Sequence, residues 1–275
     1  FSNYREDSSI SKFNKNRSTD WIAVESVLAE LVSESLKISL KTHGAFDVTI
    51  GQILKLWHFG PYRTKSAAAS VPDDKAIARA LGKTGYLKLR SRKNPPALKK
   101  DISELWVDLS GIGQGYSVDR LAEVLNESGI DAYLVELGGE LRSRGTKQDG
   151  SLWQVAVETP TVSSGSVSQV LSLSDSALST SGDYRDFKEI GGIRYSHIFD
   201  PRLGKPIQTS IASVTVMAPY CRDADAYAKA FLILSQAERQ DLVKTERLSV
   251  VLQTHNGKNF DSSYLGDMQK FSNKD

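Results

Sequence analysis

The segment 194–206, RYSHIFDPRLGKP, places His197 beside Asp200 in a predicted tight turn. Histidine changes its charge near neutral pH, so a histidine among polar neighbours can act as a general base or activate a nucleophile. A lone histidine is usually structural, and that interpretation stays open. The neighbouring Ser196 and Arg202 make a role as a general base credible, and the other three histidines have no comparable neighbours.

Hydroxyl side chains gather shortly before that segment, in the run STSGDY at residues 179–184. Hydroxyl groups and backbone N–H groups near a glycine can donate hydrogen bonds to a polar ligand. One short hairpin is predicted between this run and His197. We therefore expect two polar loops that flank a hairpin and form a pocket.

A glycine-rich loop lies in the segment 105–120, LWVDLSGIGQGYSVDR, between a strand predicted to end at Asp108 and an amphipathic helix beginning near Ser117. The glycines are Gly111, Gly113 and Gly115. Glycines let a backbone approach an anion closely, and the start of a helix favours negative charge. The spacing G-x-G-x-G matches neither the dinucleotide fingerprint nor the P-loop. For the role of this loop, an anion-binding site and a simple tight turn are both open interpretations.

Several acidic residues lie at positions where a carboxylate needs solvent, a partner or a ligand. Asp47 lies in the apolar run AFDVTI, so it must be solvated, paired or bound to a ligand, because burying a lone carboxylate is costly. Asp223 and Asp225 begin a predicted helix, where they satisfy the helix dipole or hold a divalent cation. Asp225 and Lys229 are four residues apart, so a surface ion pair is also open. The pair Gly138-Gly139 fits either a sharp bend or the approach of a planar ligand.

Composition limits the class of protein. The 275 residues are 40% hydrophobic and carry a formal net charge of +2, from 35 basic and 33 acidic residues. This balance lacks the basic field of a nucleic-acid-binding protein. The only cysteine, Cys221, excludes an intrachain disulfide framework and a thiolate zinc site, and it reads as a small semi-buried residue. No apolar run approaches the roughly 20 residues of a transmembrane span.

The periodic segments that must position these residues are helices and short strands. Apolar side chains recur at helical spacing from Trp21 to Leu36, with Asp20 as a candidate N-cap, and further helices are expected at 117–126 and 223–236. Segments 64–74 and 91–101 read as surface loops. The predicted strands are 105–109, 133–137, 153–157, 170–173, 213–217 and 248–252. Successive strands without intervening helices indicate an α+β fold with mixed, mainly antiparallel sheets.

Seven segments, taken together and in order, resemble the ApbE family of FAD:protein FMN transferases. They are NYREDSSISKFN, HGAFDVTIGQILKLW, VDLSGIGQGYSVDRLA, YLVELGGELRSRG, STSGDYRDF, RYSHIFDPRLGKPI and SVTVMAPYCRDADAYAKAF. The resemblance implies a single ApbE-like (T-fold-like) domain over residues 1–275 that lacks the family's first strand. Phe1 is not an initiator methionine, so we expect that a signal or anchor preceded it.

The resemblance also implies an activity. Members of the family bind FAD with Mg²⁺, cleave its pyrophosphate and attach FMN through a phosphoester to a threonine or serine hydroxyl of a partner flavoprotein in an electron-transfer complex. They are commonly exported, which implies an extracytoplasmic location. Some members instead hydrolyse FAD to FMN and AMP, so a FAD pyrophosphatase is an alternative. A third possibility, from another class, is a catalytically weak FAD-binding protein.

The resemblance assigns roles to particular positions. His197 matches the histidine that acts in transfer, and the backbone carbonyl of Gly111 and the carboxylate of Asp225 match magnesium ligands. The positions that match FAD contacts are Tyr4, Ala45, Phe46, Asp47, Asp108, Gln114 and Phe199. This arrangement fits the chemistry, because cleaving a pyrophosphate needs charge neutralisation and a base for the incoming hydroxyl.

Two positions depart from the family pattern. The family usually has threonine where Lys229 stands, and often a lysine or an acid where Gln114 stands. A charged ammonium cannot ligate magnesium, so Lys229 either contacts a phosphate directly or marks a member that binds FAD without turnover. An NAD-binding Rossmann enzyme is disfavoured, because Glu136 lies beside a glycine pair rather than ending a second parallel strand, and the third glycine is misplaced.

Overall fold

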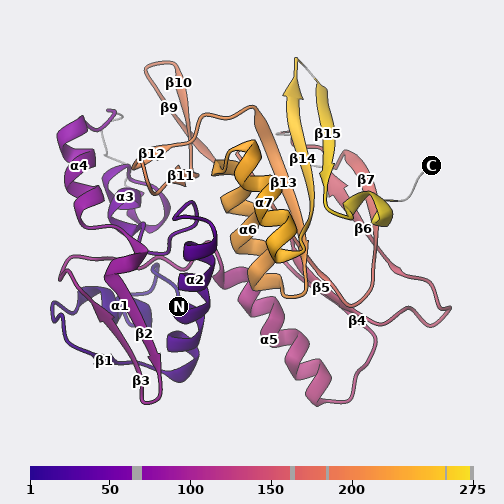
Figure 1. The fold of residues 1–275 in the computed structure, drawn as a ribbon, viewed down its shortest axis with the longest axis horizontal. Coiled ribbons are helices and arrows are strands. Elements are labelled where there is room, and N and C mark those ends of the chain that lie inside the picture. The colour runs from indigo at the N-terminus through magenta and orange to yellow at the C-terminus, as the bar shows by residue number, and fades with distance from the viewer. Residues whose placement is uncertain (64–69, 162–164, 184–185, 258, 273–275) are drawn as a thin grey trace. The chain divides into compact units, whose positions relative to one another are not determined.

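The computed structural model describes residues 1–63, 70–161, 165–183, 186–257 and 259–272. Most of the predicted loop 64–74, and Tyr184 of the hydroxyl run, lie outside these ranges. The chain divides into two compact units, Phe1–Gly111 with Asp186–Ile207, and Ile112–Arg185 with Gln208–Asp275. Figure 1 shows the helices and strands of both units. The single domain over residues 1–275 stays a prediction.

The first unit combines helices with a small antiparallel sheet of order β1-β3-β2 and two hairpins, β9–β10 and β11–β12. Its elements are α1 (Ser9–Lys15), β1 (Ile22–Ala23), α2 (Ser26–Lys41), α3 (Gly51–Leu56), the 3₁₀ turn η1 (Gly60–Tyr62), α4 (Asp74–Gly82), η2 (Tyr86–Lys88), β2 (Leu89–Lys93), β3 (Pro96–Lys100), β9 (Phe187–Ile190), β10 (Ile193–Ser196), β11 (Phe199–Asp200) and β12 (Lys205–Pro206). Helix α2 packs against β2 and β3.

Three sequence predictions for this unit are wrong. The helix predicted from Trp21 starts at Ser26, after the N-cap residue Glu25, because the residues before it pair as β1 with β3. The segment 91–101, predicted as a loop, belongs mostly to the β2–β3 hairpin. Its charged side chains hide the strand pattern, which shows only in the burial of Ala97 and Leu98 under α2.

The segment 105–109 was predicted as a strand, and that prediction is also wrong. A buried side chain replaces a neighbouring strand: Asn14 Nδ2 donates to Val107 O (2.8 Å), and Val107 N donates to Asn14 Oδ1 (2.7 Å). Asp108 N donates to Val48 O (2.7 Å), and Ile50 forms an isolated parallel bridge with Trp106. The backbone of this β-like sequence therefore forms hydrogen bonds at Val107 and Asp108 without being part of a sheet.

Lys100 ends β3 and is fully buried. Its ammonium lies 3.4 Å from Phe13 O and 3.3 Å from Asn14 O, at the C-terminus of α1, where carbonyl groups favour a cation. Burial is the main reason that the pKa of Lys100 is lowered to about 8. The folded state therefore holds this proton less tightly than the unfolded chain does.

We predict that Lys100→Met changes the pH dependence of stability. Because the folded pKa lies below the unfolded value of 10.5, the unfolded state binds more protons between these values, and the contribution of Lys100 to stability rises with pH. Between about pH 7 and about pH 10, the free energy of unfolding of the wild type should rise by about 2 kcal/mol relative to that of the variant. Urea unfolding measures this gap. Lys99→Met controls for removing a lysine from β3, and a gap that is constant with pH contradicts the prediction.

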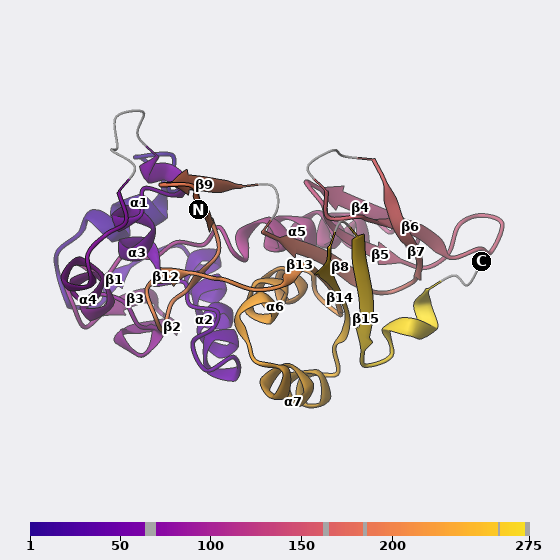
Figure 2. The ribbon, with the colours of Figure 1, turned by 90° about the horizontal axis from the view of Figure 1, so that it is seen from above.

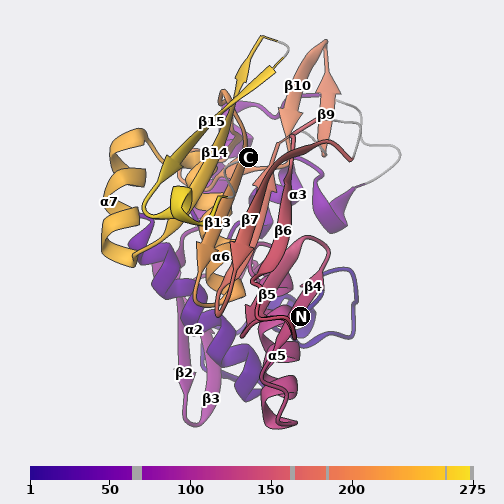
Figure 3. The same cartoon turned by 90° about the vertical axis from the view of Figure 1, so that its right-hand side faces the viewer.

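The second unit is built on a six-stranded antiparallel sheet of order β15-β14-β13-β8-β5-β4. Its elements are α5 (Gly113–Glu127), β4 (Tyr133–Leu137), β5 (Glu140–Arg144), β6 (Trp153–Glu158), β7 (Val167–Leu173), β8 (Ala177–Gly182), β13 (Ile211–Ala218), α6 (Cys221–Ile233), α7 (Gln236–Glu246), β14 (Ser249–Asn256), β15 (Asn259–Leu265) and the 3₁₀ turn η3 (Met268–Phe271). Helix α5 packs along β4 and β5, and α6 along β8 and β13 (Figure 3).

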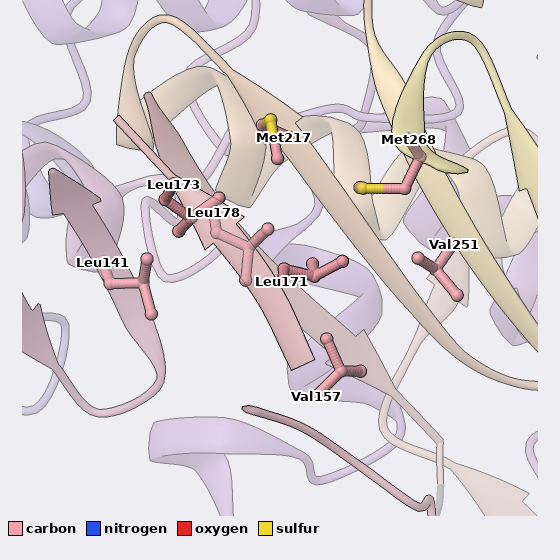
Figure 4. Packing of buried hydrophobic residues seen from close by; sticks show 8 residues of the cluster. All are labelled: Leu141, Val157, Leu171, Leu173, Leu178, Met217, Val251 and Met268. Carbon is pink, nitrogen blue, oxygen red and sulfur yellow. The ribbon is translucent and has the colours of Figure 1, made fainter. Parts of the chain in front are cut away.

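The other face of this sheet packs against the β6–β7 hairpin (Figure 2). Strand residues of the sheet meet Leu171 and Leu173 of β7 in one apolar cluster, which η3 closes with Met268 (Figure 4). The helices, the sheet and the hairpin form three layers, and the α+β fold with mainly antiparallel pairing is confirmed. No helix in the described part of the chain combines the length and the apolar character that crossing a membrane requires.

The helices and strands predicted for this unit are present with shifted ends, whereas residues 179–182 of the hydroxyl run, predicted as a polar loop, belong to β8 and pair with β13. Strands overlap each of the predicted segments 133–137, 153–157, 170–173, 213–217 and 248–252. The helix predicted at 117–126 begins earlier, at Gly113, so it includes the last part of the glycine loop. The helix predicted at 223–236 is divided between α6 and α7, where Ser235 caps α7 with a capping box.

Candidate active site

His197 follows the hairpin β9–β10, which confirms the hairpin predicted before it. Its Nδ1 lies 2.8 Å from Asp186 O, and its backbone N–H donates to the same oxygen (3.2 Å). A carbonyl oxygen only accepts, so Nδ1 must carry a proton in this contact. In the neutral ring, the lone pair is then on Nε2, which is the form that a general base requires.

The turn after His197 is fixed by Asp200 and Arg202. Asp200 is buried, and the Arg202 guanidinium donates to both of its carboxylate oxygens, Nε to Oδ1 (2.9 Å) and Nη2 to Oδ2 (2.8 Å). Backbone N–H groups of Leu203 and Gly204 donate to Asp200 O. The predicted tight turn is thus present, and the Asp200 carboxylate serves to hold it.

Phe199 lies in the core of the first unit. Its ring packs at centroid distances of 5.8 Å from Trp57 and 5.2 Å from Phe59, and the side chain is 3% exposed. The ring therefore anchors the strand after His197 rather than offering a stacking face. A contact between Phe199 and FAD stays a prediction, and it would involve the backbone.

Asp47 is buried, and its carboxylate is fully bonded within the unit. Oδ1 accepts from the N–H (2.8 Å) and the hydroxyl (2.7 Å) of Thr49, and Oδ2 accepts from Tyr86 N (2.8 Å). Burial raises the pKa of Asp47, while these donors oppose the rise. Of the alternatives for Asp47, the structure shows pairing with donors of the chain, which fixes the loop containing the buried Ala45 and Phe46.

Asp108 is another buried carboxylate of this unit, besides Asp47 and Asp200. Its Oδ2 accepts from Asn3 Nδ2 (3.0 Å), and its Oδ1 accepts from Ser110 N (2.9 Å). The bond to Ser110 shapes the turn that leads to Gly111. Tyr4, next to Asn3, is 73% exposed, so its ring is available to a ligand. The FAD contacts of Tyr4, Ala45, Phe46, Asp47 and Asp108 stay predictions.

In the second unit, the start of α5 receives a carboxylate of the chain itself. Gly115 N donates to Asp225 Oδ2 (3.0 Å), from α6. A side chain at Gly115 would meet Cys221 O at 2.3 Å and Asp225 Cβ at 2.8 Å, so only glycine allows the two helices to approach this closely. The glycine loop is therefore an anion site in part, with Asp225 as the anion, and Gly115 serves the helix contact.

Lys229 pairs with Asp225 one turn further along α6. Asp225 is fully buried, whereas the Lys229 side chain is 30% exposed, so this is not the surface ion pair considered from the sequence. Both carboxylate oxygens of Asp225 consequently have partners: Gly115 N–H on Oδ2 and the Lys229 ammonium on Oδ1.

Glu140, at the start of β5, is a titratable residue that the sequence reasoning did not select. It is 6% exposed, and its Oε2 has no hydrogen-bond partner among the described residues, while Ser179 Oγ donates weakly to Oε1 (3.4 Å). Burial, together with the nearby charge of Asp225, raises the pKa of Glu140 to about 7. Its position directly after a glycine pair was the signal that could have identified it.

The glycine pair itself forms the β4–β5 turn. Gly138 and Gly139 both have positive φ (64° and 101°), which confirms the bend and accounts for both glycines. Gln114 Nε2 donates to Leu137 O (3.0 Å) and lies where a Gly138 side chain would be. The FAD contact of Gln114 stays a prediction.

Asp119 of α5 caps the start of α6 from outside that helix. It is fully buried and accepts from Cys221 N (2.9 Å), Arg222 N (3.1 Å) and Arg142 Nη1 (2.8 Å). The N-cap residue Tyr220 offers no side-chain bond. Cys221 is buried here, and burial raises the pKa of its thiol, which agrees with a packing role.

The predicted metal ligands belong to different units: Gly111 ends the first unit, and Asp225 lies in the second. The described residues include no group of three or more His, Cys, Asp or Glu side chains that could hold a metal ion. The Asp225 oxygens are taken by an N–H group and an ammonium, and a charged ammonium has no lone pair for a metal. As these side chains stand, the donor set does not fit Mg²⁺.

Comparison with known proteins defines the class. The ApbE family profile matches residues 1–252. A relative named FAD:protein FMN transferase, from Escherichia coli strain K12, is 37% identical over 261 residues, covering 94% of this chain and 74% of its own length. The flavin transferase ApbE from Vibrio cholerae superposes with a TM-score of 0.86 at 36% identity, covering 98% of this chain and 84% of that one. The flavinyl transferase ApbE from Pseudomonas stutzeri gives a TM-score of 0.86 at 32% identity, covering 98% and 82%.

These findings identify a flavin transferase fold. The chain belongs to the ApbE family. The resemblance stated from the sequence and the prediction of a transferase are both confirmed at this level, while the roles of individual site residues stay predictions.

Proposed function

We propose that this chain transfers the FMN part of FAD to a threonine or serine hydroxyl of a partner flavoprotein. The observation that carries the proposal is His197, held by Asp186 O through Nδ1, in a chain whose relatives are named FAD:protein FMN transferase. The acceptor hydroxyl oxygen attacks the phosphorus on the FMN side, and its proton passes to His197 Nε2. The P–O bond to the AMP phosphate breaks and AMP leaves, which balances the transfer as a phosphoester.

The other predicted contacts support this proposal in different ways. The exposed ring of Tyr4 can pack on a planar flavin, and the buried acids Asp47 and Asp108 hold the loops that contain the remaining contacts of the first unit. No step is assigned to Mg²⁺, because the donors at Asp225 are engaged. The family resemblance implies dependence on Mg²⁺, but the donors at Asp225, as they stand, give that expectation no support.

We also infer the kind of partner and the location. The acceptor is a flavoprotein of an electron-transfer complex, and the chain acts outside the cytoplasm, both as the family resemblance implies. FAD pyrophosphatase activity is the second candidate, because water can take the place of the acceptor hydroxyl at His197 Nε2 and release FMN with AMP.

Labelling of an acceptor tests the proposal. The purified chain is incubated with FAD and Mg²⁺, with or without a flavoprotein acceptor from the same source, and protein-bound flavin is followed on a denaturing gel while free FMN and AMP are quantified. A fluorescent acceptor band with equimolar AMP is expected. FMN and AMP in equal amounts without a labelled acceptor would point to the pyrophosphatase, and intact FAD with measurable binding would leave only a flavin-binding protein.

A further inference from the structure

The pairing of Lys229 with Asp225 is the feature that the family pattern leaves unexplained. Asp225 is fully buried and is held on its other oxygen by Gly115 N (3.0 Å), which lies at the start of α5. The Lys229 ammonium approaches Asp225 Oδ1 and also lies 3.4 Å from the carbonyl oxygen of Asp225. Lys229 is therefore fixed at its tip by the residue one turn before it.

We propose that the Lys229 ammonium is the resident cation of the Asp225 carboxylate, and that it replaces a divalent metal in neutralising the diphosphate of FAD. An ammonium carries three N–H donors, and one of them remains for another acceptor when the other two are on Asp225 Oδ1 and on the Asp225 carbonyl oxygen. The side chain is 30% exposed, so this donor can reach a ligand. This inference rests on the proposed function for the identity of the diphosphate.

A divalent ion cannot share this position. To reach Asp225 Oδ1 it would have to displace Lys229, and the displaced ammonium would remain on the same turn of α6 and repel the ion. Asp225 Oδ2 keeps a second lone pair, but it lies at the helix contact with Gly115 N, and the Asp225 side chain is only 1% exposed, so an ion has little access to it. The tethered cation is always present, so binding of the diphosphate does not depend on the concentration of free metal.

The buried Glu140 carboxyl points to the same conclusion. Glu140 interacts electrostatically with both Asp225 and Lys229, and its Oε2 has no hydrogen-bond partner among the described residues. Two acids near one ammonium favour keeping that ammonium in place, since moving Lys229 away would remove a cation that interacts with both.

Metal dependence of the Lys229 variants tests this proposal. Lys229→Thr removes the cation and supplies a hydroxyl oxygen, Lys229→Arg keeps the charge, and Lys244→Thr makes the same exchange at an exposed site on α7. Mn²⁺ binding to each protein with FAD is measured by titration calorimetry, and FAD affinity is measured with Mg²⁺ and with a chelator. Thermal unfolding confirms that each variant folds.

Three results are expected. The wild type, Lys229→Arg and Lys244→Thr should bind FAD with an affinity that a chelator changes by less than about threefold, and Lys229→Thr should lose at least about tenfold in chelator. Lys229→Thr should also bind Mn²⁺ at least about tenfold more tightly than the wild type does. Tight Mn²⁺ binding to the wild type, or equal metal dependence of wild type and Lys229→Thr, would overturn the proposal. Acceptor labelling that fails under all conditions rejects the proposed function instead, while the Mn²⁺ titration still decides the role of Lys229.

Discussion

Replacing His197 by asparagine should lower the rate of acceptor labelling by about 10²- to 10⁴-fold, the range that loss of a general base produces. The side-chain amide of asparagine can occupy the place of Nδ1 and donate to Asp186 O, as the imidazole does at 2.8 Å. It has no group at the place of Nε2 that can accept the proton of the acceptor hydroxyl. The variant thus keeps the bond that positions the loop and removes only the proton acceptor.

FAD binding serves as the control for this variant. His197→Asn should bind FAD within about threefold of the wild type, because the bond that orders the loop is retained. His197→Ala loses that bond as well, so it should combine the loss of labelling with weaker order of the hairpin. Labelling by His197→Asn at close to the wild-type rate would show that His197 positions the loop and that another group is the base.

The strands of the second unit were predictable because each has a strong β pattern of its own. The strand β13 contains the β-branched run SVTVM, and all of its residues are buried in the sheet. Segments whose structure depends on a distant partner were not predictable. The run LWVDL has the same β pattern, but its hydrogen bonds go to the Asn14 side chain and to Val48 O, so no strand forms. Conversely, the charged hairpin β2–β3 has a weak pattern and forms because α2 covers it.

The residues of the candidate site divide in the same way, into those whose setting follows from the nearby sequence and those whose setting depends on distant segments. The local signals around His197, a polar turn after a hairpin, predicted its setting correctly. The glycine pair marks Glu140 as a candidate, but the burial of Glu140 and of Asp119 could not be predicted, because their environments include α6, about eighty to a hundred residues away in the sequence. Spacing alone suggested the Asp225–Lys229 pair, but its burial and its contact with Gly115 depend on how α5 crosses α6.

Replacing Asp119 by alanine should destabilise the second unit by about 3–5 kcal/mol, the cost of removing one member of a buried ion pair. The carboxylate accepts from Cys221 N and Arg222 N, which have no intrahelical partner at the start of α6, and from the Arg142 guanidinium. Arg142 and Arg222 are only 18% and 20% exposed, so neither regains full hydration when Asp119 is lost. Urea unfolding followed by circular dichroism measures the change.

The matched control is Asp131→Ala, which removes an acid that is 80% exposed and lies 3.0 Å from Arg144. An exposed pair of this kind contributes about 0–1 kcal/mol, so the two aspartates should differ several-fold in effect. Because Asp225 is on the helix that Asp119 caps, Asp119→Ala should also weaken FAD binding at temperatures where the chain is still folded, and Asp131→Ala should not. Equal effects of the two substitutions would mean that the start of α6 is held by its packing against β8 and β13, and that the buried Asp119 carboxylate contributes little to placing Asp225.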